Sequence, residues 1–372
     1  MKKSCIILLF ILASALTISA VEKKKSSEDF QADTCSLSNI HDTKKKNIFI
    51  KAYDLLVNYL DYYSYDTAYI RPPAFKYTVM LQQSASFENY TIRTNTPRVQ
   101  KLRLAPDHSY KLGAYFGWHS LFLGFSINTD ELFSKRKGSN KKTEYFINMY
   151  GCQLGCDLFY RSTGNDFKIR ESEGFFHNGV EHNLRGVDYS GLKVKSFGAN
   201  VYYVFNNKHF SYPAAYAQTT VQKISRGTLV AGLSWSRHDC DFNHSLLPEE
   251  IRNDMSESLK FTNVRYTDFN INFGYAFNWV FQDNWLLAVA LTPAIAYKTS
   301  NIQVQSSDYN QKYRNINFDF ITRAGLVYNN NRFFAGASAV AHVYQYYQKN
   351  FSLTDNFGIL NVYVGLNFGK KD

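Results

Sequence analysis

The sequence predicts an all-β protein, a transmembrane antiparallel up-and-down β-barrel of about 12–14 strands with a short N-terminal helical preface. Three observations support this prediction. Long segments alternate between apolar and polar or small residues, aromatic residues make up 17% of the 372 residues, and the chain ends in an alternating strand that closes on Phe368. This aromatic content fits the two interfacial girdles of a barrel. The long unbroken apolar run is confined to the N-terminus, which excludes a helical membrane protein.

The first twenty residues have the features of a secretory signal peptide. Lys2 and Lys3 supply positive charge, residues 6–16 form an apolar run of signal-peptide length, and Ser19 and Ala20 supply the small residues of a cleavage site. Cys5 precedes the apolar run, so a lipoprotein anchor is not expected. The sequence therefore predicts export through a cleaved signal peptide to the outer membrane of a Gram-negative bacterium.

Two segments separate the signal peptide from the barrel. Residues 21–46 are rich in Lys, Ser and Asp and are expected to form a flexible polar linker. Residues 47–73 are expected to form an N-terminal periplasmic helical preface, because apolar residues such as Phe49, Tyr53 and Leu60 recur at helical spacing over 47–63. We expect this helix to pack on its own barrel; a partner-binding helix is the alternative.

The net charge of +11 bears on the partners of the chain. Lys and Arg are scattered along the sequence rather than clustered, and with the export signal this argues against nucleic acid. The excess fits loops that face anionic lipid headgroups or polysaccharide. We therefore expect outer-membrane lipid and lipopolysaccharide as partners, with the barrel-assembly machinery during folding; soluble partners stay unidentified, and no cofactor is expected.

The predicted barrel occupies residues 74–368 and a tail occupies 369–372. The candidate strands are 75–81, 85–93, 99–105, 110–118, 121–128, 144–150, 153–161, 192–206, 228–235, 267–279, 285–297, 316–328, 333–344 and 360–368. Long polar loops are expected at 129–142, 165–190, 237–265 and 299–315, while tight turns are expected at 119–120, 282–284 and 329–331. Short links on one side and long loops on the other are typical of outer-membrane barrels.

The segment from 267 to 297 shows the clearest alternation. Its first half places Phe269, Ile271 and Phe273 on one face, with Asn270 and Asn272 on the other. We therefore expect Phe273 to face lipid and Asn272 to face the lumen. A shift of one residue would exchange every side chain between these two environments.

The last strand also has two distinct faces. Its apolar face carries Leu360, Val362, Val364, Leu366 and Phe368. An alternating terminal strand that closes on Phe resembles the sorting signal of bacterial outer-membrane barrels. The tail at 369–372 departs from this pattern.

The long link between the strands at 192–206 and 228–235 carries a family resemblance. It reads Phe-Asn-Asn-Lys-His-Phe-Ser-Tyr-Pro-Ala-Ala over 205–215, and an Asp-Thr-Ala-Tyr-Ile run occupies 66–70. With these segments the chain resembles a family of uncharacterised outer-membrane barrels from Bacteroidota, classed only as a domain of unknown function. The resemblance implies the fold and the location, and it implies no activity. Its family-like periplasmic segment includes Asn206, His209, Phe210, Ser211, Tyr212 and Pro213.

The same link admits two arrangements. Pro213 can start a short helix that contains Ala214, Ala215 and Ala217. Such a helix could fold into the barrel mouth as a plug, or form an ordinary periplasmic helical turn.

Six charged residues are predicted to face the lumen. They are Lys111, Asp157, Arg161, Asp268, Asp319 and Arg323. In a barrel of this size such residues form a polar network that fills the interior. The alternative is a pore lining that sets selectivity.

The sequence shows no strong signature of a metal site or a disulfide. Cys152 and Cys156 lie four residues apart on one predicted strand, about 13 Å, too far for a disulfide; Cys35 and Cys240 leave other pairings open. His238, Cys240 and His244, with two neighbouring aspartates, lack a tight ligand pattern. No metal-binding residues are therefore expected.

No catalytic residues are expected either. Ser338 and His342 share a face, but about 13 Å separates them, too far for a nucleophile and its base. The leading hypothesis is a passive or gated conduit for small solutes. A closed structural or partner-binding barrel is the alternative, and a lipid-active outer-membrane enzyme is less favoured. A lumen filled by aromatics or by residues 206–225 would favour the closed barrel.

Overall fold

The computed structural model describes residues 65–72, 74–118, 121–129, 142–304 and 307–370. The predicted signal peptide, linker and helix at 47–63 lie outside the described residues, as do the turn at 119–120 and most of the loop at 129–142. Among the described residues, no helix is long and apolar enough to span a membrane.

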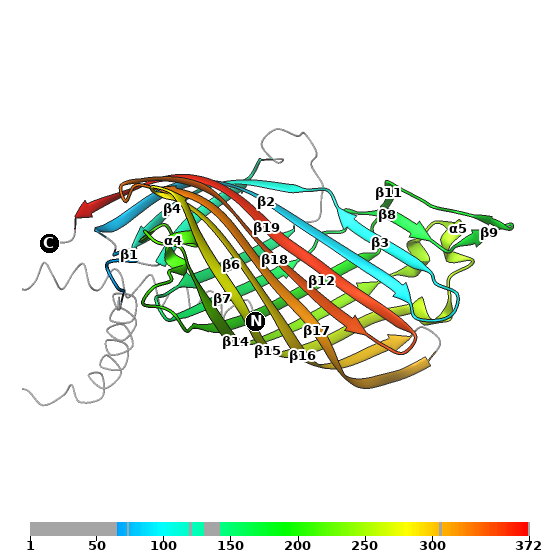
Figure 1. Cartoon of the computed structure of the whole chain (residues 1–372). Helices are drawn as coiled ribbons and strands as arrows, with labels where there is room; N and C mark the ends of the chain where they lie inside the picture. The colour runs from blue at the N-terminus through cyan, green and yellow to red at the C-terminus, as the bar shows by residue number, and fades with distance from the viewer. Residues whose placement is uncertain (1–64, 73, 119–120, 130–141, 305–306, 371–372) are drawn as a thin grey trace, which may run out of the picture. The chain divides into compact units, whose positions relative to one another are not determined.

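Twelve strands form the wall of the barrel in the described part of the chain (Figure 1). In chain order they are β2 (Phe75–Thr94), β4 (Ser109–Trp118), β5 (Leu121–Asn128), β6 (Thr143–Tyr150), β7 (Leu154–Ser162), β12 (Leu192–Val204), β14 (Arg226–Phe242), β15 (Phe261–Gln282), β16 (Trp285–Val304), β17 (Ser307–Asn329), β18 (Phe333–Tyr347) and β19 (Phe351–Lys370). The antiparallel order runs β5–β4–β2–β19–β18–β17–β16–β15–β14–β12–β7–β6. The last strand thus pairs with the first, and the predicted fold class is confirmed.

The two ends of the wall differ. At one end short turns join β15 to β16 and β17 to β18. Asn284 and Asn331 occupy these turns with φ angles of 65° and 82°, which Asn tolerates better than most residues. The predicted turns at 282–284 and 329–331 are therefore confirmed. We call this end the plug end, because the segment between β12 and β14 lies in it, and the opposite end the cap end.

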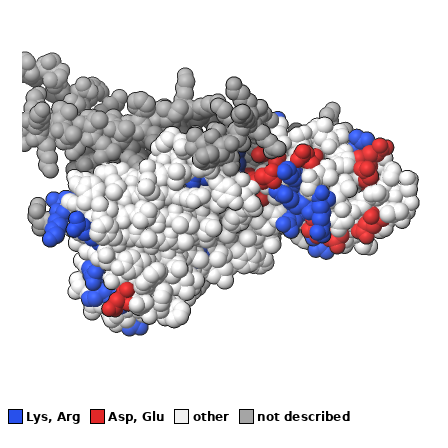
Figure 2. All heavy atoms as spheres, turned by 90° about the horizontal axis from the view of Figure 1, so that it is seen from above, with Lys and Arg blue, Asp and Glu red and all other residues white. Residues whose placement is uncertain are grey.

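The outward face of the wall carries an apolar belt. On β15, Ile271 is 68% exposed and Phe273 is 54% exposed, while Asn272 between them is 1% exposed. Figure 2 shows a broad surface with few charged side chains between two ends where Lys, Arg, Asp and Glu gather. A soluble sheet would bury such a face, so the belt is the surface that a barrel presents to lipid. The predicted register of β15 is confirmed.

The alternation inverts between the belt and the cap end. On the outward face of β14, exposed Leu233 and Trp235 give way to exposed Arg237. On its inward face, buried polar residues give way to Cys240 and Phe242, both about 2% exposed or less. Strands therefore continue beyond the membrane, where the outer face meets water and the inner face builds an apolar core.

This inversion explains where the predicted loops were wrong. The expected loop at 237–265 begins inside β14 and ends inside β15, and most of the loop expected at 299–315 belongs to β16 and β17. Outside the membrane the outward residues become polar, so the lipid-facing pattern disappears while the strand continues. Residues 75–94 form the single strand β2 rather than two strands.

Additional elements complete the cap. Strands β3 (Lys101–Pro106), β8 (Phe167–Glu173) and β11 (Val187–Tyr189) extend the sheet beside the upper part of β2, and a small hairpin of β9 (Phe176–His177) and β10 (Val180–Glu181) adjoins them in sequence. Between β14 and β15 lie η1 (His244–Leu246), α5 (Glu249–Arg252) and η2 (Glu257–Leu259). The predicted strand at 99–105 is thus a cap strand, and the predicted loop at 165–190 contains strands.

One apolar core joins these cap elements to the wall. Members buried to 1% exposure or less include Leu102, Leu104, Phe167, Ile169, Phe175, Leu192, Phe242, Ile251 and Phe261. Because β2, β14, β15 and β19 run from the wall into this core, cap and wall form a single packed unit.

A lysine scan along β16 tests the belt. Leu291 lies within the belt and is 54% exposed, and Thr299 lies on the same face toward the cap end. We expect Leu291→Lys to lower the free energy of unfolding by about 2–4 kcal/mol and Thr299→Lys by about 0–1 kcal/mol, because only the first charge enters hydrocarbon. Denaturant unfolding in lipid vesicles measures both. Equal costs would mean that β16 does not cross the bilayer at Leu291.

Candidate functional site

Three layers of residues fill the interior of the wall. The segment around α4 (Tyr212–Tyr216) occupies the plug end, a layer of charged and polar side chains occupies the middle, and the apolar core occupies the cap end. The middle layer contains the predicted lumen residues, so the candidate site is built from it and from the plug.

Lys298 on β16 lies at the centre of the middle layer. Its Nζ donates to Asp268 Oδ2 at 3.0 Å and to both carboxylate oxygens of Asp319 at 3.1 and 3.0 Å. All three side chains are buried. Asn270 also donates to Asp319, at 3.1 Å. The ammonium and the two carboxylates lie where water is excluded. Each of these buried charges therefore needs an opposite charge nearby, and this arrangement supplies it.

Arg161 on β7 makes a second ionic contact across the lumen. It is 1% exposed, and its Nη2 donates to both oxygens of Asp355 on β19, at 3.3 and 3.2 Å. The same nitrogen donates to the hydroxyl of Tyr90 at 2.5 Å, and the guanidinium lies 3.7 Å from the ring centre of Phe357. Since β7 and β19 are far apart in the sheet order, this contact ties opposite sides of the wall.

His238 on β14 lies between the two ionic groups. Its ring nitrogens are 3.8 Å from Asp268 and 3.7 Å from Asp355, and its ring stacks on Tyr266 with centroids 4.6 Å apart. Nε2 also lies 3.0 Å from the hydroxyl of Ser236. The histidine therefore links the Lys298 and Arg161 groups into one layer.

A third ionic group lies nearer the plug. Arg323 on β17 pairs with Asp157 on β7, again across the lumen. Asn200 donates to Asp157 at 2.9 Å, and Asn272 donates to Asn200 at 3.0 Å. The guanidinium of Arg323 also lies 5.3 Å from the ring centre of Tyr202. Hydrogen bonds and an ion pair therefore connect these buried side chains across the lumen.

Ion pairs also connect β4 with β6. Residues 130–141 lie between these two strands in the sequence. Lys111 on β4 donates to Glu144 on β6 at 3.0 Å. Lys142 lies 3.0 Å from Glu144 and 2.9 Å from Glu88 on β2. These contacts connect inward faces of strands that are not neighbours in the sheet order.

The structure places all six predicted lumen residues on inward faces. Asp157, Arg161, Asp268, Asp319 and Arg323 are buried, and the Lys111 side chain is 21% exposed. It distributes them over four ionic groups, together with residues that sequence reasoning missed: Glu88, Glu144, His238, Lys298 and Asp355. Lys298 could have been found, because it continues the inward phase of Ala294 and Ala296.

The structure shows the surroundings of the histidines and cysteines that were weighed as metal ligands or disulfide partners. His238 and Cys240 are buried on the inward face of β14, whereas Asp241 is exposed, so the five neighbouring candidates do not converge. In the part of the chain that the structure describes, no group of three His, Cys, Asp or Glu residues could hold a metal ion. Cys152 lies in the turn before β7 rather than on the strand, with its sulfur 3.6 Å from the amide nitrogen of Asn207. Cys156 and Cys240 are free thiols.

Ser338 and His342 both lie on the inward face of β18. His342 stacks on Phe357 with ring centroids 4.9 Å apart and near Tyr344 at 6.0 Å. Within the described residues no hydrogen bond joins Ser338 to His342. The histidine packs among aromatic rings and is not presented to a serine nucleophile.

The plug is built on α4. Ser211 caps the helix, its hydroxyl accepting from the backbone nitrogen of Ala214 at 3.2 Å, and Pro213 occupies the first turn, where its missing N–H costs little. Phe210, Tyr212 and Ala215 are buried, packed against Tyr150, Tyr202 and other inward side chains. Of the two arrangements that the sequence left open, the structure shows the plug. The predicted short helix is present; it begins one residue earlier, at Tyr212, and ends at Tyr216, so that Ala217 is its C-cap and not inside it.

Side-chain amides on alternate strands hold the plug. Asn278 on β15 donates to the carbonyl of Ser211 at 2.9 Å, and Asn329 on β17 donates to the carbonyl of Gln218 at 3.0 Å. Asn367 on β19 lies 3.4 Å from the same carbonyl. Gln218 donates in turn to the Tyr363 hydroxyl at 2.8 Å. The wall thus satisfies backbone groups that would otherwise be buried without partners.

Residues 66–71 dock on the plug. Strand β1 (Ile70–Arg71) pairs with β13 (Val221–Gln222), which follows α4. The backbone nitrogen of Asp66 donates to the carbonyl of Lys208 at 2.9 Å, and the Tyr69 ring lies 4.4 Å from that of His209. Arg226 donates to the Tyr69 hydroxyl at 2.8 Å. The two segments that carry the family resemblance are therefore in direct contact.

A lipid-facing belt, an antiparallel wall whose last strand pairs with its first, and a filled lumen define an outer-membrane type of β-barrel. Residues 64–368 match the model of the family described as "Domain of unknown function (DUF4421)". The chain belongs to this family. A comparison with curated proteins finds no match.

Several solved structures resemble the chain. The outer membrane protease OmpT of Escherichia coli is 8% identical with a TM-score of 0.38, covering 79% of this chain and 97% of its own. The outer membrane protein OprG of Pseudomonas aeruginosa is 9% identical with a TM-score of 0.24, covering 80% and 98%. The toluene transporter TodX of Pseudomonas putida is 10% identical with a TM-score of 0.19, covering 80% and 91%.

Removal of the central cation tests the middle layer. Lys298→Met leaves Asp268 and Asp319 buried together without their shared partner, and we expect it to lower the free energy of unfolding by about 3–5 kcal/mol. Adding Asp268→Asn and Asp319→Asn to this variant should restore most of the loss, because no unpaired charge then remains. Equilibrium unfolding in vesicles gives both values.

The matched control for this test is an exposed ion pair. Lys260 lies 2.6 Å from Glu257, whose side chain is 80% exposed. Lys260→Met should change stability by less than about 1 kcal/mol. A similarly small effect of Lys298→Met would show that water reaches the middle layer.

Proposed function

We propose that the protein is a closed outer-membrane barrel with a structural or partner-binding role, acting through its surfaces rather than by axial passage of solutes. The observation that carries this proposal is the filling of the lumen at three heights, by the plug, the ionic layer and the cap core. Aromatic side chains and residues 206–225 both occupy the interior, and each of these features favours a closed barrel over an open conduit.

The cap is the main obstacle to an axial path. Its core includes side chains of β2, β14, β15 and β19, which continue the wall, so the core cannot move away as a separate unit. Opening it would expose side chains such as Phe242, Phe261 and Phe351. Burial of one such side chain contributes about 1.5–3 kcal/mol, so exposure of several would cost a large part of the stability of a typical domain.

A conduit for small solutes stays compatible with the fold, and with this lumen it would be a gated conduit. One observation favours this second candidate. Besides its apolar packing, the plug is held to the wall by amide hydrogen bonds, each of modest net strength, and it is bound from the plug end by residues 66–71. A movement of residues 66–71 could therefore displace the plug.

The same proposal includes the location and orientation of the barrel. The short turns lie at the plug end, as do the first residue of β2 and the last residue of β19. This supports a periplasmic plug and an outward cap. We infer a Gram-negative host of the Bacteroidota and export through a signal peptide at residues 1–20. The partners proposed are outer-membrane lipid, lipopolysaccharide and the assembly machinery. A hydrolase has less support, because His342 packs among aromatic rings.

Conductance in planar bilayers tests the closed lumen. The samples are the full chain, a variant in which residues 208–223 are replaced by a short Gly-Ser link, and a milder variant that combines Asn278→Ala with Asn329→Ala. We expect all three to give no conductance steps, because the ionic layer and the cap remain. Different migration of heated and unheated protein on a gel verifies that each sample is folded.

The outcomes separate the two candidates. Conductance steps from the unaltered chain would contradict the closed barrel. Steps from the plug variants alone would show that the plug is the gate, and would replace the closed barrel with the gated conduit.

A further inference from the structure

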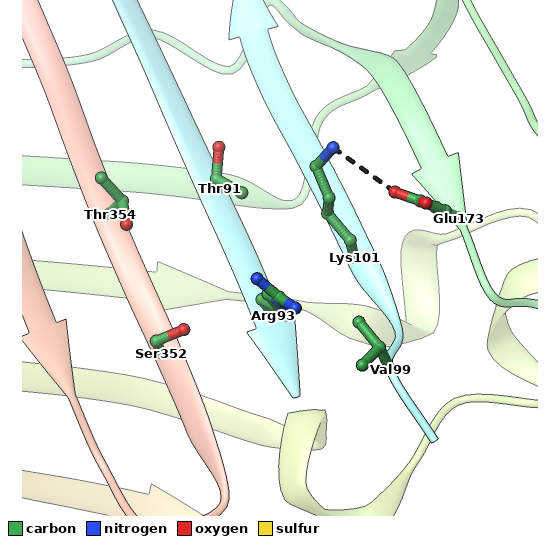
Figure 3. A pocket seen from close by; sticks show the side chains of 7 residues that line it. All are labelled: Thr91, Arg93, Val99, Lys101, Glu173, Ser352 and Thr354. Carbon is green, nitrogen blue, oxygen red and sulfur yellow. Dashed lines mark hydrogen bonds and ion pairs between the residues drawn. The ribbon is translucent and has the colours of Figure 1, made fainter. Parts of the chain in front are cut away.

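A groove lies on the outward surface of the cap, where four strands meet. It has a volume of about 420 Å³ and is lined by Thr91, Arg93, Val99, Lys101, Glu173, Ser352 and Thr354 (Figure 3). The strands are β19, β2, β3 and β8, joined by pairs such as Ser352 with Arg93, Arg93 with Lys101, and Lys101 with Glu173. The polar row therefore runs straight across the sheet.

Arg93 differs from the neighbouring cations in its pairing. Lys101 lies 3.4 Å from Glu173 and 3.2 Å from Glu171, and Figure 3 shows the first of these contacts. On the same face, Lys168 and Arg170 bind Asp107 at 2.6 and 2.8 Å. The hydrogen bond from Lys168 helps hold the pKa of Asp107 below its ordinary value.

No acidic side chain among the described residues pairs with Arg93, which is exposed in the groove. The hydroxyls of Thr91, Thr354 and Ser352 line the wall beside it. The Ser352 hydroxyl also donates to Asn95 Oδ1, at 3.4 Å. The unpaired guanidinium and the hydroxyls of Thr91 and Thr354 are therefore the donors for an anion. Guanidinium groups bind phosphate through two parallel hydrogen bonds, so phosphate fits this set well.

The height of the groove indicates where such a phosphate would come from. On β2 the outward apolar residues Tyr77, Val79, Leu81 and Phe87 precede the groove. Thr91 and Arg93 lie four and six residues beyond Phe87, about 13 and 20 Å along the strand. With a tilt of about 40° these distances become heights of about 10 and 15 Å above the apolar belt. This is the layer of headgroups rather than of bulk water.

We propose that this groove binds a phosphate group of a lipopolysaccharide molecule in the outer leaflet, with Arg93 as the main contact. The phosphorylated sugars of that lipid extend above the acyl chains to the height of Arg93, and its acyl chains lie against the belt below. Lys101 is largely neutralised by Glu171 and Glu173, so its contribution is smaller. This inference depends on the membrane orientation of the barrel and not on whether its lumen opens.

Lipid retention tests the proposal. The folded full chain in phosphatidylcholine nanodiscs is incubated with deep-rough lipopolysaccharide, separated from free lipid, and analysed by native mass spectrometry. Arg93→Ala should lower retention about tenfold, the loss of one charge-assisted contact. Glu173→Gln should raise retention, because it removes the opposing charge. Lys195→Ala, which removes an exposed cation of β12 outside the groove, should leave retention unchanged.

Three further results would overturn the proposal. These are equal retention by the full chain and Arg93→Ala, equal retention of enzymatically dephosphorylated lipopolysaccharide, and complete displacement of the lipid by millimolar inorganic phosphate, which would assign the groove to free phosphate. Unfolded variants are excluded beforehand by gel migration. This experiment does not measure conductance. Loss of lipopolysaccharide binding would therefore not contradict the closed barrel, and conductance steps in planar bilayers would not contradict lipopolysaccharide binding.

Discussion

The long strands of this wall cross two media, and this constraint organises the rest of the structure. Within the bilayer a strand must present apolar side chains outward and polar ones inward; above it, the same strand must do the reverse. β14 makes the exchange between Trp235 and Arg237 on one face and between His238 and Cys240 on the other. The strand keeps its hydrogen-bonded ladder throughout. The lipid-facing belt, the ionic layer and the cap core are therefore consecutive parts of the same strands.

The ionic layer follows from the width of the barrel. Eight strands enclose a space that side chains fill, whereas twelve enclose more. Here long cations reach across the gap, with Arg161 and Arg323 on opposite walls from their carboxylates. Charges in such a space need partners, and each group supplies them locally: Asp355 for Arg161, Asp157 for Arg323, two aspartates for Lys298. The arrangement serves packing and charge balance together.

The sequence predicts what depends on a period of two. The faces of β15 and β19, the inward phase of Asp268, Asp319 and Arg323, and the turn at Asn331 follow from local alternation and turn chemistry. His238 was read as part of a polar loop, because the lipid-facing pattern ends at Trp235. The pairing of Arg161 with Asp355 depends on how the wall closes, which alternation along one strand does not encode. Whether residues 206–225 fill the lumen depends on its volume, which is also a property of the whole wall.

The plug bears on the curvature of the wall. Asn278, Asn329 and Asn367 belong to β15, β17 and β19, every second strand along one arc, and each reaches the same short stretch of backbone around α4. A capped helical turn has a fixed width. A wall with more or fewer strands would bend through a different angle between these positions, and the three amides could no longer all reach the helix. The contacts of the α4 segment with these three strands thus fit a barrel of this strand number and diameter.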